Sequence, residues 1–299
     1  MAVQQILNED VQDVAFWANV QHNICDQTSI FSHECLSVSV GACSNLKHIS
    51  MLPRQLCLHV KGVKKLQRSQ DVRSQIQVIM KNLFDILPSL IDQVQDIAQC
   101  GKCAVVGNSG RLKGSKYGEK IDSHQFVLRI NTAPTKGFEL DVGRRTTHRF
   151  IYPESAMNLN PGTHLVLLPF KPLDLKWLAS AFSSGDIKHT YKRVQQFIQA
   201  DKNKVLIIHP GFLKYIHDKW TKQHGRYPST GLTALIFAIH VCTQVSAFGF
   251  GADSNGDWHH YWEENYLAGA FRKTRVHDGD FEFVLIKRLA AEGKVSFYS

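Results

Sequence analysis

The sequence lacks long hydrophobic runs. None of its apolar stretches reaches the roughly 18 residues that a membrane-spanning helix needs, and the longest, Leu232–Cys242, is interrupted by His240. This stretch is typical of a buried helix. Met1–Gln21 carries three acidic residues, which is incompatible with a secretory signal peptide. We therefore expect neither an anchor nor a signal in this chain.

Common nucleotide-binding fingerprints are also missing. The sequence has neither GxGxxG nor GxxxxGK[ST], which weakens a dinucleotide or ATP interpretation. Its net charge of +9 indicates an anionic partner. The basic residues are scattered, however, and form no aromatic-interleaved run, so nucleic acid is disfavoured. A nucleotide sugar is an anion that fits this charge. The sequence also lacks any N-x-[ST] glycosylation sequon, which is unusual for a lumenal enzyme.

The cysteines do not complete a zinc site. Of the seven, four lie between Cys25 and Cys57, inclusive. Cys100 and Cys103 form a CxxC, and Cys242 stands alone. A CxxC is either half of a zinc site or a redox pair, and no second CxxC accompanies this one. Buried free thiols and disulfides of an oxidising compartment both remain open.

The chain is organised around two short apolar runs that end on polar residues. Ala104–Val106 predicts a buried strand that stops at the turn Gly107–Gly110, and Phe126–Ile130 predicts another that stops at Asn131. An open α/β sheet binds nucleotides at the carboxyl ends of its strands. The amides of Asn108 and Asn131 offer donors and acceptors there.

Further strands and helices alternate along the chain, which predicts an α/β fold with a Rossmann-like, mainly parallel sheet flanked by helices. Residues 1–65 lack clear periodicity, and we interpret them as a divergent, poorly specified N-terminal segment before a folded domain over residues 66–299. The other predicted strands are His164–Phe170, Lys204–His209, Val245–Phe250 and Val295–Tyr298. The predicted helices are Val72–Leu87, Leu173–Phe182, Phe212–Trp220, Gly231–Val241 and Phe281–Ala291.

Two segments after residue 225 offer groups for binding a sugar. Ser229 and Thr230 precede a predicted helix, where hydroxyls and backbone N–H groups make either an anion site or a plain N-cap. Gly249 and Gly251 flank Phe250 at a strand end, where backbone can approach a sugar and a ring can stack on it.

Three histidines are candidates for chemistry. His259 and His260 are adjacent, so their side chains diverge and at most one is expected to face a given site. His277 lies in a loop, and a neutral histidine with a pKa near ~6.5 suits removal of a sugar hydroxyl proton. The following Asp278-x-Asp280 has the DxD form of a manganese site, but aspartates at a helix start also favour the helix dipole.

Together, and in this order, these residues closely resemble the animal sialyltransferases. Their long, short, third and very short motifs match Cys103–His148, Gly225–Gly249, His259–Glu263 and His277–Glu282. The match covers roughly Leu66–Ser299, and the linking segments are most similar to the β-galactoside α-2,3-sialyltransferases acting on Gal-β-1,3-GalNAc. The resemblance implies a GT-A-like variant of the Rossmann fold.

The resemblance also implies the site residues. His277 would be the general base, and His260 would bind the leaving phosphate of CMP-sialic acid. The donor would contact Asn108, Asn131, Tyr152, Tyr191, Ser229, Thr230, Gly231 and Gly251. Within that set, the asparagines would hold the phosphate and ribose, and Tyr191 would bind the phosphate, with Tyr152 nearby. Ser229–Gly231 would receive the sialic acid carboxylate, and Gly251 would contact the nucleotide through its backbone. The acceptor galactose would contact Gln67, Tyr227 and Phe250.

The implied reaction is an inverting transfer of sialic acid to the galactose 3-hydroxyl of a glycoprotein or glycolipid. It would need no metal and no cofactor, because CMP-sialic acid is a co-substrate and protein groups can stabilise a departing monophosphate. The family also implies a Cys103–Cys242 disulfide and an enzyme anchored in the Golgi membrane. The alternatives are a non-catalytic relative that binds CMP or glycans, an isoform made inactive by its divergent N-terminus, and a nucleotide-dependent enzyme of another class. Retention of Gln67, His260 and His277 favours catalysis.

Overall fold

The computed structural model describes residues 68–87, 101–253, 256–263 and 276–298. Its centre is one sheet of seven strands in the order β5-β4-β3-β2-β1-β6-β7, and every neighbouring pair is parallel. The strands are β1 (Lys102–Val106), β2 (Phe126–Ile130), β3 (His148–Ile151), β4 (His164–Leu167), β5 (Val205–Ile207), β6 (Gln244–Phe248) and β7 (Ser296–Tyr298). The α/β, Rossmann-like prediction is confirmed.

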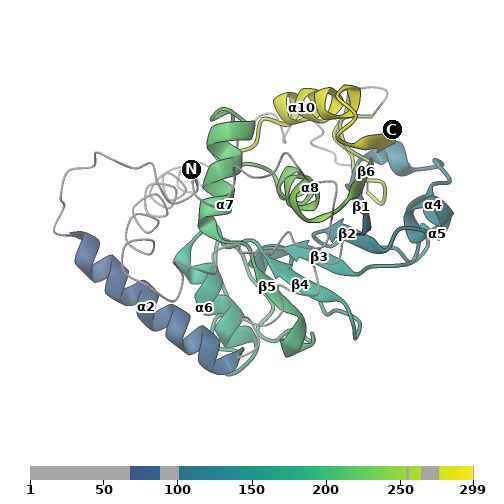
Figure 1. The fold of residues 1–299 in the computed structure, drawn as a ribbon. Helices are drawn as coiled ribbons and strands as arrows, with labels where there is room; N and C mark the ends of the chain where they lie inside the picture. The colour runs from purple at the N-terminus through teal and green to yellow at the C-terminus, as the bar shows by residue number, and fades with distance from the viewer. Residues whose placement is uncertain (1–67, 88–100, 254–255, 264–275, 299) are drawn as a thin grey trace.

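Helices cover both faces of the sheet (Figure 1). One face packs against α7 (Pro210–Tyr215), α8 (Thr230–Val241) and α10 (Gly279–Ala291). The other packs against α2 (Arg68–Ile86), α4 (Gly118–Asp122), α5 (Glu139–Val142) and α6 (Pro172–Ala181). Short 3₁₀ turns lie at η2 (Gly110–Leu112), η3 (Pro153–Ser155) and η4 (Lys202–Lys204), and the π-helical turn η5 is Ile216–Trp220. Because both faces are covered, β1 and β2 are nearly continuous apolar runs.

The sequence prediction missed β3, which runs from His148 to Ile151. All four residues of this strand are buried, including His148 and Arg149. A strand of four residues that carries two ionisable side chains has no apolar run to reveal it. Predicted strand 164–170 ends earlier, at Leu167, because the chain turns there toward α6.

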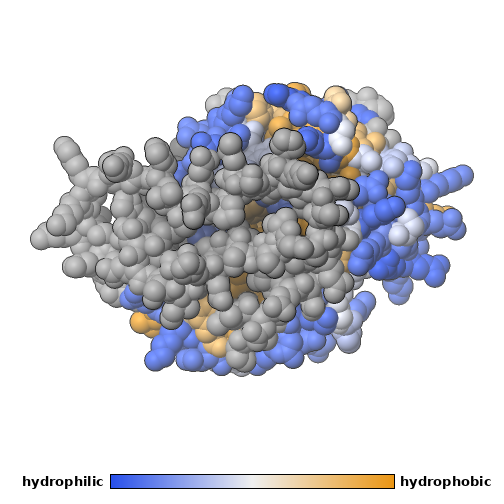
Figure 2. All heavy atoms as spheres, viewed as in Figure 1, coloured by the Kyte–Doolittle hydropathy of each residue, from blue (hydrophilic) through white to orange (hydrophobic). Residues whose placement is uncertain are grey.

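Polar side chains gather over α4 and α5, on the right of Figure 2. Glu119 and Lys120 of α4 are exposed there, whereas Ile121 packs inward with Val142 of α5. Among the described residues, no helix combines the length and the apolar character that crossing a membrane requires.

Candidate active site

The order in which the chain adds strands reverses at β1, which has β2 on one side and β6 on the other. In open α/β sheets ligands bind at such a switch point, beyond the carboxyl ends of the strands. Gly107 follows β1 here, and its N–H donates to the carbonyl of Phe248 at 2.7 Å. A Cβ at Gly107 would collide with the carbonyl of Gly249, so the tight turn out of β1 requires glycine.

Asn108 and Asn131 both lie at this edge of the sheet. The side-chain Oδ1 of Asn108 is buried, and the described residues offer it no hydrogen-bond donor. Asn131 has a positive φ of 54°, and its Oδ1 accepts a hydrogen bond from Ser155 at 2.9 Å. The Arg149 guanidinium donates to the Asn131 carbonyl at 3.0 Å and fixes this turn. A buried acceptor without a partner needs a donor, and a ligand hydroxyl or amine would provide one to Asn108.

The His259–Glu263 segment returns to the same edge. Ser109 and His260 form an antiparallel bridge, and the Tyr261 N–H donates to the Asn108 carbonyl at 3.1 Å. This pairing places His260 beside the turn after β1. The ring of His260 stacks on Trp262 with centroids 4.4 Å apart, and its Nδ1 lies 2.6 Å from a carboxylate oxygen of Glu263. The structure therefore gives His260 a fixed orientation.

His277 is oriented by the backbone. Its Nδ1 lies 2.9 Å from the carbonyl oxygen of Tyr227. Since a carbonyl can only accept, Nδ1 carries the hydrogen, and Nε2 is the basic nitrogen of the neutral ring. The rings of Tyr227 and His277 meet edge to face at 5.0 Å. Phe170 contacts Tyr227 at 4.7 Å and Tyr152 at 6.0 Å, so these rings form a continuous row.

The start of α8 is tied to a buried carboxyl group. The N–H of Ser229 donates to Glu282 at 2.8 Å, and its hydroxyl donates to the same side chain at 2.5 Å. The Ser229 Oγ also accepts from the Leu232 N–H at 3.1 Å and so caps the helix. Burial raises the pKa of Glu282 to about 7. Because the Ser229 hydroxyl is committed, an anion at this helix start would meet the backbone N–H groups of Thr230 and Gly231.

Glu282 is a site residue to which the sequence reasoning gave no role. It shares the buried stripe of α10 with Ile286 and Leu289, at positions i, i+4 and i+7. An acidic residue on an apolar stripe is the signal that would have revealed it.

Phe250 and Gly251 follow β6 at the switch point. Phe250 is only 9% exposed, and a Cβ on Gly231 would lie 3.1 Å from its ring. The Phe250 ring thus packs on the first turn of α8, and its predicted contact with the galactose stays a prediction. Gly251 has a φ of +92°, and a Cβ there would collide with Phe283. Its place requires glycine.

Comparison with known proteins assigns the family. The family model for glycosyltransferase family 29 (sialyltransferase) matches residues 54–294. The chain belongs to this family. The mouse CMP-N-acetylneuraminate-β-galactosamide-α-2,3-sialyltransferase 2 is 57% identical over 221 residues, or 74% of this chain and 63% of the relative. The human α-2,3-sialyltransferase 1 of the same type is 50% identical over 236 residues, or 78% of this chain and 69% of the relative. The chain thus spans less than two thirds of the mouse relative.

Solved sialyltransferases share the fold. A crystal structure of a mammalian sialyltransferase in complex with Gal-β-1,3-GalNAc-ortho-nitrophenol superposes with a TM-score of 0.68 at 48% identity. The superposition covers 75% of this chain and 79% of that one. The predicted family is confirmed.

The disulfide implied by the family is present. Cys103 and Cys242 are bonded, with Cα atoms 6.1 Å apart and a sequence separation of 139 residues. The bond joins β1 to the residue after α8. In the chain-entropy model, closing a loop of this length stabilises the fold by about 5 kcal/mol.

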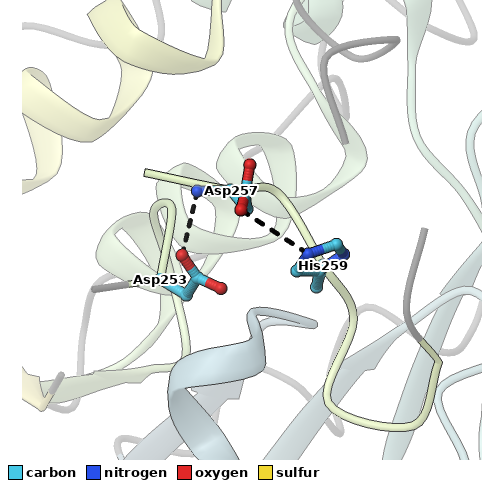
Figure 3. Close-up of side chains that lie close together, drawn as sticks. All are labelled: Asp253, Asp257 and His259. Carbon is cyan, nitrogen blue, oxygen red and sulfur yellow. Dashed lines mark hydrogen bonds and ion pairs between the residues drawn. The ribbon is translucent and has the colours of Figure 1, made fainter. Parts of the chain in front are cut away.

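In Asp278-x-Asp280, the first aspartate has a structural role. Asp278 is the N-cap of α10 and accepts from the Phe281 N–H at 3.1 Å. Its other oxygen pairs with His224 at 3.0 Å. A different group has metal-ligand chemistry: one ligand atom from each of Asp253, Asp257 and His259 lies within 4.8 Å of the others (Figure 3). Asp257 is held there by its N–H, which donates to Asp253 at 2.9 Å.

Some predictions lie outside the described residues. They are the acceptor contact of Gln67, the partner of Cys100 and the character of residues 1–65. Tyr191 and Tyr152, by contrast, are both described. The Tyr191 N–H donates at 3.1 Å to Glu154, which lies two residues after Tyr152, so one carboxylate links the two segments.

Proposed function

We propose that the protein transfers sialic acid from CMP-sialic acid to the 3-hydroxyl of a terminal galactose of the Gal-β-1,3-GalNAc type. Family membership supports the reaction class. Curated relatives are named CMP-N-acetylneuraminate-β-galactosamide α-2,3-sialyltransferases, and a related crystal structure holds Gal-β-1,3-GalNAc-ortho-nitrophenol. The observation that carries the assignment of the base is the hydrogen bond between His277 Nδ1 and the Tyr227 carbonyl.

In the proposed reaction, Nε2 of His277 removes the proton from the galactose 3-hydroxyl. The oxygen attacks the anomeric carbon of sialic acid as the bond from that carbon to the phosphate oxygen breaks, which inverts the configuration. The phosphate keeps the bonding electron pair and leaves as CMP. His260 and the hydroxyls of Tyr152 and Tyr191 would stabilise the negative charge that develops on the phosphate.

The rest of the donor would bind along the carboxyl edge of the sheet. Asn108, with its unpartnered buried Oδ1, would accept a hydrogen bond from the ribose or the base. The sialic acid carboxylate would receive hydrogen bonds from the Thr230 and Gly231 N–H groups at the start of α8. Ser229 would act through its bond to Glu282 and its cap on this helix. We also propose that the protein works in the Golgi lumen on glycoprotein or glycolipid acceptors.

The test is a transfer assay with purified protein, CMP-sialic acid and a panel of galactosides. We expect an α-2,3-linked product on Gal-β-1,3-GalNAc, and at least roughly 100-fold slower transfer with the H277A variant. CMP binding without any transfer would favour a non-catalytic relative. The absence of both CMP binding and transfer would overturn the proposal.

A further inference from the structure

Three ionisable side chains form a buried cluster outside the reaction proposed above. The ammonium of Lys171 lies 2.9 Å from Asp174 and 3.4 Å from Glu154. The three side chains are at most 9% exposed. Glu154 comes from the turn η3 after β3, Lys171 is the residue before α6, and Asp174 lies in the first turn of α6. Burying three charges is costly unless each is paired and hydrogen-bonded.

Asp174 and Glu154 each have a local task. Asp174 accepts hydrogen bonds from the backbone N–H groups of Phe170, at 2.8 Å, and Lys171, at 3.1 Å. Glu154 accepts from the Tyr191 N–H at 3.1 Å and from the Thr190 hydroxyl. The two carboxylates thus fix the start of α6 and the segment that carries Tyr191.

Lys171 contacts Tyr191 in a different way. Its Nζ lies 3.5 Å from the centroid of the Tyr191 ring, in addition to its contacts with the Glu154 and Asp174 carboxylates. A cation over an aromatic face is attracted by the ring quadrupole, more strongly where water is excluded. The same cation draws electron density from the ring, which makes the phenol O–H a better hydrogen-bond donor.

We propose that Lys171 is a positioning residue for the donor phosphate, which acts by holding the Tyr191 ring and polarising its hydroxyl. This inference rests on the proposed function. When the bond between sialic acid and the phosphate oxygen breaks, CMP gains a negative charge, and the hydrogen bond from Tyr191 strengthens with it. Lys171 therefore contributes more to the transition state than to donor binding.

The test is a double-mutant cycle of K171M and Y191F, with kcat, acceptor KM and CMP affinity measured for each variant. We expect K171M to lower kcat roughly 10- to 100-fold and to change the acceptor KM less than about threefold. In the Y191F background the same change should lower kcat less than about threefold. K176M is the matched control, because Lys176 is an exposed lysine of α6, the helix that Lys171 precedes.

A spectroscopic readout separates positioning from loss of structure. In protein labelled with ¹³Cζ-tyrosine, the signal that Y191F removes should shift in K171M and stay in place in K176M. K171M leaves two buried carboxylates without their cation, so K171M/D174N is the substitute if K171M fails to fold.

The outcomes are distinct. If the wild type transfers sialic acid but the K171M effect is equally large with and without Tyr191, Lys171 is merely structural and the inference is wrong. An unchanged Tyr191 signal would overturn it as well. If the wild type neither transfers sialic acid nor binds CMP, the proposed function fails and this inference fails with it.

Discussion

The two histidines proposed for the reaction are both tied at Nδ1, but to groups of different charge. His277 faces the neutral carbonyl of Tyr227, whereas His260 faces the Glu263 carboxylate. A carbonyl fixes the tautomer and adds no net charge, which suits a ring that removes a proton. A carboxylate also compensates the positive charge of a doubly protonated ring, which suits contact with a phosphate. The partner of each ring therefore supports the two proposed roles, with His277 as the base and His260 as the phosphate contact.

Replacement of His277 is expected to have the largest effect among the tests of this difference between the two histidines. We expect H277A to lower kcat by roughly 10² to 10⁴, the usual contribution of a general base, with CMP affinity unchanged. Steady-state kinetics and calorimetric CMP binding measure the two quantities. H224A removes a histidine beside Asp278 at the same end of α10 and should retain most activity. If H277A remained active, another group would have to take the acceptor proton.

The surroundings of the two histidines also differ in their carboxyl groups. Glu282, which follows His277 in the chain, is buried, whereas the side chain of Glu263 beside His260 is 50% exposed. Burial raises the pKa of Glu282 from 4.5 to about 7. The folded state therefore binds this proton more tightly than the unfolded chain. The resulting stability is fully present below pH 4.5 and is lost as the pH rises through 7.

The E282Q variant tests this pH dependence. Between pH 4.5 and 7.5, the wild type should lose about 3 kcal/mol of unfolding free energy relative to E282Q. Urea unfolding of both proteins across this range measures the difference. Parallel curves for E282Q and the wild type would contradict a raised pKa of Glu282.

A smaller effect is expected on the His260 side. H260A should weaken both CMP binding and turnover, by roughly 10- to 100-fold, because a charge-assisted bond to phosphate exists in the ground state and the transition state. E263Q should produce part of the same loss, since it removes the charge that orients the ring. A loss of kcat without any loss of CMP affinity would contradict this division of roles.

The sequence predicted those parts of the fold that follow an apolar pattern. The runs after Cys103 and before Asn131 became β1 and β2, and the helix after Ser229 became α8. The sequence did not predict β3, because its His148 and Arg149 are buried without an apolar pattern that marks burial. Their burial depends on strands and helices from elsewhere in the chain, and local sequence does not contain that information.

The site was predictable in its motifs but not in its pairings. The His277 loop and the Ser229 cap were expected, whereas the Ser229–Glu282 bond joins residues 53 positions apart. The Lys171 cluster likewise brings Glu154 to Lys171, although 17 positions separate them in the sequence. Resemblance to a family supplied the roles of single residues, and only the three-dimensional arrangement supplied their partners.

The smallest expected effect concerns metal ions. We expect EDTA to leave transfer unchanged within about twofold, because His260 and the tyrosine hydroxyls would stabilise the departing phosphate without a cation. Asp253, Asp257 and His259 nevertheless present ligand atoms within 4.8 Å of one another, directly before His260. A cation there would link the His260 side to metal concentration, and the His277 side would stay unaffected.

Three measurements distinguish these cases. Transfer is followed with EDTA, with EDTA and excess manganese, and in D257N and D280N under the same conditions. If EDTA abolished transfer and manganese restored it in D280N but not in D257N, the Asp253–Asp257–His259 group would bind the metal. The reverse pattern would return the role to Asp278-x-Asp280, although Asp278 caps α10. Equal activity in every condition would mean that the contrast between the two histidines arises from their protein partners alone.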